Sequence, residues 1–273
     1  MNPFSESLAV REIEPGRRYE GSLDERWTIG PKLHGGAMLA LIASAAQTAC
    51  PQPGQQPVAV SANFLSAPDP GTMQLLTSIR KQGRRISVLD LELVQGDRVA
   101  VHAVVTLGQP ESEHAPLLTA LPVVDLMTPE PPPDVVSIGA GHEFSGMVNL
   151  AQCCDIRPVI SSVNAGVGPD GRPIPPVIQI WVRPREGAVD SLFALMCSDL
   201  SVPVTFAVDR YGWAPTVQFT ALLREPPVDG WLRVVCSSVE IGQDWFDEDH
   251  TVVDQLGRLV VQSRQLAMVP RQP

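Results

Sequence analysis

The 273-residue chain has few positive charges: 20 lysine and arginine residues stand against 30 aspartate and glutamate residues, for a net charge of −10. A protein that binds nucleic acid normally presents a basic surface, so this balance argues against that class. It does not exclude a small anionic ligand, because a local cluster of arginines can still bind one.

Long apolar runs are also missing, and none approaches the roughly 18 residues that a membrane-spanning helix requires. Residues 1–18 carry mixed charges and no apolar centre, so we do not expect a signal peptide. The five cysteines are an odd number, lack metal-ligand spacing and include one adjacent pair, which is poor geometry for a disulfide. We therefore expect a cytoplasmic protein without metal or cofactor, whose reduced cysteines are buried. They are Cys50, Cys153, Cys154, Cys197 and Cys236.

Short catalytic signatures are absent as well. The sequence contains no phosphate-binding P-loop, no Gly-x-Ser-x-Gly nucleophile turn, no zinc spacing and no dinucleotide fingerprint. Any chemistry must therefore come from residues that no single short motif marks.

The chain does contain an internal repeat of one sequence pattern. Residues 64–71 end in Pro-Gly and lead into a strand-like stretch, and residues 222–230 end in Asp-Gly and lead into another. Each copy continues into a hairpin, where Arg98 and Arg258 hold equivalent places. A duplication of this length indicates a tandem pseudo-dimer rather than a solenoid of short repeats.

Seven prolines lie between Pro110 and Pro133 and predict a stiff, partly extended linker. This divides the chain into an N-terminal domain over residues 1–108, a linker over 109–142 and a C-terminal domain over 143–273. Each domain has a size typical of folded domains.

Each half predicts one helix and a set of antiparallel strands. In the first half, Gly35-Gly36 opens a helix over 37–46 that is apolar nearly all round and therefore buried. In the second half, Asp190 is the expected N-cap of a helix that ends before Pro203. The predicted fold is α+β, with two antiparallel sheets that each wrap a central helix. The expected strands cover 58–65, 72–81, 86–94 and 99–107, then 176–182, 216–224, 231–241, 250–253 and 258–269.

Asp199 is the first candidate for chemistry. Together with Leu192, Leu195 and Met196 it follows the spacing i, i+3, i+4 and i+7, which places a carboxylate on the apolar stripe of the second helix. Burial should raise its pKa towards the range of a general base. The alternative is a carboxylate that caps or pairs structurally near the end of the helix.

Gln265 and Thr216 are the next candidates. Gln265 alternates with small and apolar residues in the last strand, so it is expected inside, where it either acts in a site or satisfies backbone groups. Strict alternation puts Thr216 on the polar side with Gln218, which counts against a buried role unless that side meets the other half or a groove. In the first copy, counting from shared residues places Val58 and Val105 at these two positions.

Three further groups of residues have alternative interpretations. His34, Gly35 and Gly36 lie at the start of the first helix, where free N–H groups favour an anion. His34 is also a candidate catalytic base, although the neighbouring glycines more simply indicate a loop with a close backbone approach. Arg84 and Arg85 form a basic turn, which is either a solvated hairpin or a contact for phosphates. An acidic stretch is expected to be a surface loop; it contains Asp244, Asp247, Glu248 and Asp249.

At these residues, from about Arg26 to Pro270, the chain resembles the double-hotdog acyl-CoA thioesterases of the type II (TesB-like) family. His34-Gly35-Gly36 is similar to the family's glycine-rich helix entry, and Cys197-Ser198-Asp199 is similar to its helix-borne Ser-Asp. The resemblance implies that Asp199, Thr216 and Gln265 activate water for thioester hydrolysis, and that amides near Gly35 and Gly36 bind the oxyanion.

The prediction is therefore an acyl-CoA thioesterase, with a non-hydrolytic acyl-CoA or lipid-binding protein as the alternative. A hydratase on the same fold would need an Asp/His pair after the central helix, and none of the five histidines has that position. Exposed sheet edges and an uncovered outer face predict a homo-oligomer.

Overall fold

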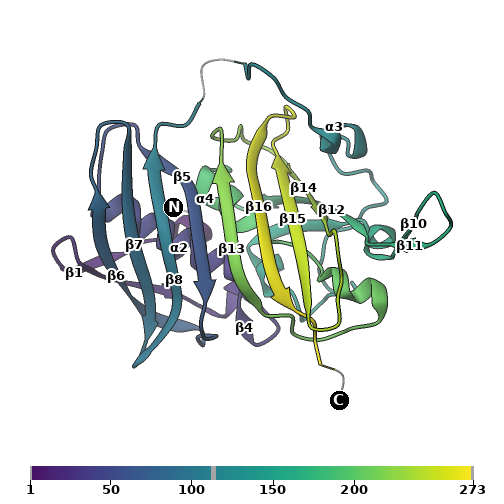
Figure 1. Cartoon of the computed structure of the whole chain (residues 1–273), viewed down its shortest axis with the longest axis horizontal. Coiled ribbons are helices and arrows are strands. Elements are labelled where there is room, and N and C mark those ends of the chain that lie inside the picture. Colours follow the sequence, from purple (N-terminus) through teal and green to yellow (C-terminus); the bar gives the residue numbers. More distant parts are fainter. Residues whose placement is uncertain (1, 112–114, 272–273) are drawn as a thin grey trace.

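The computed structural model describes residues 2–111 and 115–271, and a single curved antiparallel sheet dominates it (Figure 1). Its strand order is β1-β2-β6-β7-β8-β5-β13-β16-β15-β14-β12-β9. The first half supplies β1 (Arg11–Glu14), β2 (Arg18–Leu23), β5 (Gln56–Phe64), β6 (Gly71–Lys81), β7 (Ile86–Gln95) and β8 (Arg98–Gly108). The second half supplies β9 (Cys154–Pro158), β12 (Val177–Pro184), β13 (Thr216–Leu223), β14 (Leu232–Ser237), β15 (Trp245–Val253) and β16 (Leu259–Met268).

The order of strands confirms the duplication. The run β6-β7-β8-β5 in the first half is mirrored by β14-β15-β16-β13 in the second, and the antiparallel pair β5–β13 joins the halves. The fold is thus the predicted α+β double hotdog, and the two expected sheets are continuous with each other through this central pair.

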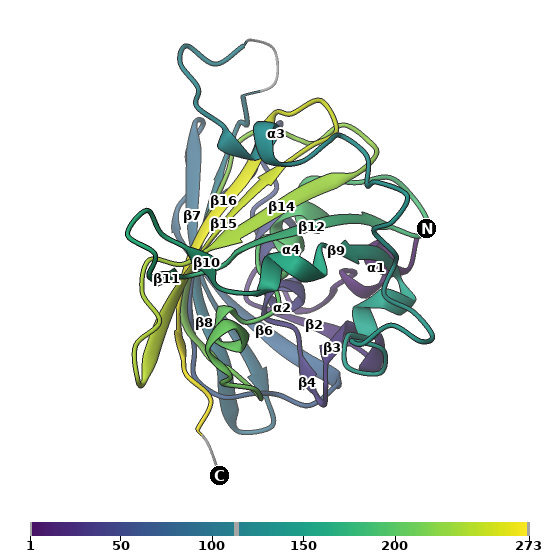
Figure 2. The same cartoon turned by 90° about the vertical axis from the view of Figure 1, so that its right-hand side faces the viewer.

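One helix per half lies on the same side of the curved sheet (Figure 2). The helix α2 (Gly35–Ala49) is apolar nearly all round and buried, as predicted. The shorter α4 (Ser191–Cys197) begins at Asp190, whose carboxylate accepts the Phe193 N–H at 2.7 Å, which confirms the predicted N-cap.

The two helices pack against each other in opposite directions, so that the end of α4 meets the start of α2. A side chain at Gly36 would place its Cβ 2.3 Å from the Met196 carbonyl oxygen, far inside van der Waals contact. Only glycine permits this approach. The glycine-rich entry therefore fixes the contact between the two halves at the N-terminus of α2.

The linker differs from the prediction, because part of it is an ordered element rather than an extended spacer. The helix α3 (Pro122–Leu126) and Met127 pack on the outer face of the second half, against Trp181 and Trp231. Trp181 Nε1–H donates to the Thr128 carbonyl at 2.8 Å. The outer face is therefore covered here, and the expectation that it lies open is wrong for this part of the sheet.

Two boundaries also differ from the sequence predictions. Helix α4 ends at Cys197, so Asp199 lies in the turn that follows rather than in the helix. The acidic stretch is not a surface loop, because β15 begins at Trp245 and alternates between buried and less buried residues, with Glu248 on the buried side.

Smaller elements are α1 (Pro3–Ser7) and the short hairpins β3–β4 (Thr28–Ile29, Lys32–Leu33) and β10–β11 (Gly166–Val167, Pro173–Ile174). Four 3-10 helices also occur in the described chain: η1 (Glu25–Trp27), η2 (Asn149–Gln152), η3 (Ile160–Val163) and η4 (Val204–Val208). All five cysteines are buried and free, as expected. Within the described residues, every helix is too short or too polar to cross a bilayer.

Candidate active site

Asp199 lies where the two halves meet. Its side chain is 8% exposed, and its Oδ2 accepts the Gly36 N–H at 2.7 Å. Burial raises the pKa of Asp199 from 3.8 to about 7, while the hydrogen bond from Gly36 opposes the rise. The carboxylate is thus held at the positive N-terminus of α2 and changes charge near neutral pH.

His34, the N-cap residue of α2, also contacts this turn. Its Nε2 lies 3.0 Å from the Asp199 carbonyl oxygen, which assigns the ring proton to Nε2, and 3.7 Å from Asp199 Oδ2. Burial lowers the pKa of His34 to about 4, so the ring is neutral above that pH. Its contacts support a role in holding the Asp199 backbone.

Gly35 and Gly36 present their amides differently. Gly36 N–H is engaged by Asp199. Across residues 2–111 and 115–271, no hydrogen-bond acceptor contacts the Gly35 N–H. The carboxylate of Asp199 is therefore the anion that the Gly36 N–H binds at this helix start. The Gly35 N–H remains available as a donor to another group.

Thr216 and Gln265 are hydrogen-bonded to each other, with Thr216 Oγ1 donating to Gln265 Oε1 at 2.6 Å. Gln265 is buried on the inner face, as predicted. Strict alternation misplaced Thr216, because a β-bulge at Val217 shifts the phase of β13. Thr216 lies opposite Ala267, an inner-face residue, and so faces Gln265 instead of sharing a face with Gln218.

The bulge also corrects the match between the two copies. Pro57 lies opposite Leu107 in the first half as Thr216 lies opposite Ala267 in the second. The structural counterpart of Thr216 is therefore Pro57 rather than Val58. Val105 remains the counterpart of Gln265.

Glu248 is a site residue that the sequence analysis missed. It is 2% exposed, and Gln265 Nε2 donates to its Oε2. Ser201 Oγ donates to Oε2 at 3.1 Å, and Val204 N–H donates to Oε1 at 2.9 Å. Burial raises the pKa of Glu248 to about 7, and the Asp199 carboxylate adds to the rise. The sequence signal that could have revealed it is the period-2 spacing of Glu248 with the apolar residues Phe246 and Val252, which predicts one buried face of a strand.

Two hydrogen bonds tie the turn that carries Asp199 to this face of the sheet. Before Asp199, the Ser198 carbonyl accepts the Ser263 hydroxyl at 2.6 Å. After it, Ser201 donates to Glu248. Because Ser263 and Gln265 are neighbours on one face of β16, these anchors hold the turn that carries Asp199 against the face of the sheet that carries Gln265 and Glu248.

Among the described residues, three buried side chains of metal-ligating type also lie together. The ligand atoms of Cys236, Glu248 and His250 are within 4.8 Å of one another. Thiolate, carboxylate and imidazole are zinc ligands. Here the Glu248 carboxylate is already engaged by three hydrogen-bond donors.

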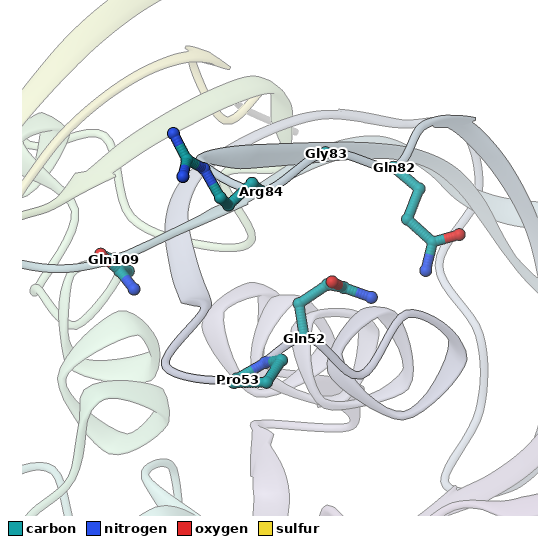
Figure 3. Close-up of a pocket in the computed structure, with 6 residues that line it drawn as sticks. All are labelled: Gln52, Pro53, Gln82, Gly83, Arg84 and Gln109. Atoms are coloured by element: carbon teal, nitrogen blue, oxygen red, sulfur yellow. The ribbon is translucent and has the colours of Figure 1, made fainter.

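Arg84 and Arg85 lie far from Asp199, at the opposite end of α2. Arg84 lines an open cavity of about 440 Å³; Figure 3 shows it with Gly83 and Gln82 along one side and Gln52 and Pro53 across from them. Helix α2 has 15 residues and is about 22 Å long, so the two arginines at its far end are separated from Gly36 by roughly that length. The phosphate-binding role of both arginines stays a prediction.

Comparisons with known proteins agree with this architecture. Residues 23–108 match the family model described as acyl-CoA thioesterase N-terminal domain, and residues 129–269 match the one described as acyl-CoA thioesterase C-terminal domain. The chain is 62% identical to uncharacterized proteins of Mycobacterium tuberculosis and Mycobacterium bovis, over 98% of its own length and 99% of theirs.

Solved structures share the fold at low identity. A hot dog fold protein of unknown function from Alicyclobacillus acidocaldarius superposes with a TM-score of 0.81 at 20% identity, covering 100% of both chains. The acyl-CoA thioesterase II TesB2 of Mycobacterium marinum superposes with a TM-score of 0.72 at 17% identity, covering 99% of this chain and 97% of that one. With both of its halves matched in order, the chain belongs to the acyl-CoA thioesterase family.

Proposed function

We propose that the protein hydrolyses acyl-CoA thioesters with a water molecule that Asp199 activates. The observation that carries the proposal is the meeting of a buried carboxylate from the second half with the helix N-terminus of the first. A pKa of about 7 leaves much of Asp199 ionised near neutral pH, as a general base requires.

Thr216 and Gln265 supply complementary groups for that water. The Thr216 proton is committed to Gln265, so Thr216 Oγ1 is left as an acceptor. Gln265 Nε2 has two protons and gives one to Glu248, so the second is left as a donor. A water that donates to Asp199 and Thr216 and accepts from Gln265 keeps one lone pair for attack.

The chemical steps balance without a covalent enzyme intermediate. The water oxygen bonds to the thioester carbonyl carbon as its proton moves to Asp199. The Gly35 N–H stabilises the resulting oxyanion, because it is a fixed donor at the positive end of α2. The intermediate then breaks its carbon–sulfur bond, and the proton on Asp199 goes to the departing CoA thiolate.

In this proposal the CoA moiety lies with its phosphates towards Arg84 and Arg85, at the other end of α2. CoA is a long thiol, and arginines suit phosphate groups. Both guanidinium groups are on the first half, whereas Asp199 is on the second, so one substrate molecule would contact both domains.

A thiol-release assay over acyl-CoA chain lengths tests the proposal, with binding measured by calorimetry on the same samples. We expect release of free CoA for at least one chain length. Tight binding without release at any length would contradict hydrolysis and favour the non-hydrolytic acyl-CoA-binding protein.

A further inference from the structure

The Gln265 amide has two ends of nearly equal shape, and its partners decide which end faces which way. A hydroxyl such as that of Thr216 either donates or accepts, so it imposes no direction. An ionised carboxylate only accepts. Of the two partners of Gln265, only Glu248 can therefore set the direction of the hydrogen bonds that link Thr216, Gln265 and Glu248.

Three hydrogen-bond donors around Glu248 oppose the effect of burial and stabilise the ionised form that does so. Its oxygens receive hydrogen bonds from the Ser201 hydroxyl, the Val204 amide and Gln265 Nε2, and each of these donors stabilises negative charge. With Nε2 drawn to Glu248, Oε1 must face Thr216, and Thr216 must donate to it.

We infer that Glu248 is a positioning residue, which orients Gln265 so that Thr216 accepts from the attacking water while Gln265 donates to it. The inference rests on the proposed thioester hydrolysis. Protonation of Glu248 removes the constraint, because a carboxylic acid donates as well as accepts. The Gln265 amide can then turn over, and the hydrogen bonds to Thr216 and Glu248 can reverse their direction.

The other titratable groups that face this cluster stay neutral near pH 7. Burial lowers the pKa of His34 to about 4 and that of His250 to about 3. Burial raises the pKa of the Cys236 thiol well above its ordinary value. Asp199 and Glu248 are therefore the groups that change charge together in this range.

The test compares Glu248→Gln with Asp247→Asn. Asp247 is the matched control: it is the preceding residue of β15, faces the other side, and accepts the Val239 and Glu240 amides at 3.0 and 2.9 Å. We expect Glu248→Gln to lower kcat about 10–100-fold, the range typical when a residue that orients a site residue by a hydrogen bond is replaced, with KM within about twofold. Asp247→Asn should change neither constant by more than about twofold.

The pH profile separates positioning from a merely structural role. In the wild type, log(kcat/KM) should rise with pH at a slope above 1 below neutrality, because two carboxylates must ionise. In Glu248→Gln the slope should fall to 1, and the midpoint should move to lower pH because a like charge near Asp199 is gone. An unchanged slope with an unchanged kcat would overturn the inference.

A readout that does not depend on activity is the NMR signal of the Gln265 side-chain amide, assigned by its loss in Gln265→Glu. We expect this signal to titrate in the wild type and not in Glu248→Gln. If the wild type releases no thiol, the proposed function fails, and the titration alone decides whether Glu248 orients Gln265. If the wild type is active and the amide does not respond to Glu248, only the inference fails.

Discussion

The inner faces of the two halves differ in chemistry although their strands pair in the same register. Five matched positions are largely apolar in the first half and polar in the second. They are Thr77, Leu89, Leu91, Ala103 and Val105 in the first, and Cys236, Glu248, His250, Ser263 and Gln265 in the second. The duplicated scaffold thus keeps an apolar core under α2 and places its polar groups under α4.

Around Asp199 the first half contributes the His34 ring and, above all, backbone amides. Gly36 lets α2 approach the end of α4, and its N–H binds Asp199. A side chain at Gly35 would place its Cβ 2.6 Å from Asp199 Oδ2. Neither half therefore holds the complete site, and each of the following predictions tests this division.

The largest expected effect is that of Asp199→Asn, which keeps an acceptor for Gly36 N–H but removes the base. We expect kcat to fall 10²–10⁴-fold, the usual contribution of a general base. Asp90→Asn on the outer face of the first half is the control and should leave kcat within about twofold. Steady-state thiol release measures both, and a normal kcat for Asp199→Asn would exclude the base assignment.

A reciprocal exchange at matched positions should have opposite consequences. Gln265→Val, which copies Val105, should lower kcat about 100-fold through loss of a fixed donor. Val105→Gln should leave kcat nearly unchanged and lower the free energy of unfolding by about 1–3 kcal/mol, because it buries an amide among Leu89 and Ala103 without a partner.

Urea denaturation and thiol release on both variants check this exchange. The division of labour between the halves is wrong if Val105→Gln loses as much kcat as Gln265→Val while both stay folded.

The smallest effect is expected from Arg84→Ala combined with Arg85→Ala. Exposed ion pairs contribute about 0.2–1 kcal/mol each, so loss of both arginines should raise KM for acyl-CoA about 2–30-fold with kcat unchanged. Acyl-pantetheine, which lacks the nucleotide phosphates, is the matched control substrate and should show no change. An equal rise in KM for both substrates would argue against phosphate contacts.

Sequence patterns predicted most strands, both central helices, the Asp190 cap and the inward position of Gln265, since these follow from periodicity and capping chemistry. The inward face of Thr216 was not predictable by alternation, because one bulged residue reverses the phase of β13. Glu248 was missed because three acidic residues in a row read as solvated surface, although burial alternates through them.

The pairing of Asp199 with Gly36 was only partly foreseeable. Residue spacing predicted that Asp199 is buried and that the start of the first helix favours an anion. It could not predict that the two meet, because their contact depends on how α4 packs antiparallel to α2 in the folded protein.

The central claim is that one site lies between the end of α4 and the start of α2. A crystal structure of the Asp199→Asn variant with an uncleaved acyl-CoA tests it most directly. The account predicts that the thioester carbonyl carbon lies near the side chain at position 199, with room between them for a water whose oxygen is roughly 3–3.5 Å from that carbon. The carbonyl oxygen should point towards the Gly35 amide. A thioester bound in a cavity that neither Gly35 nor position 199 borders would contradict it.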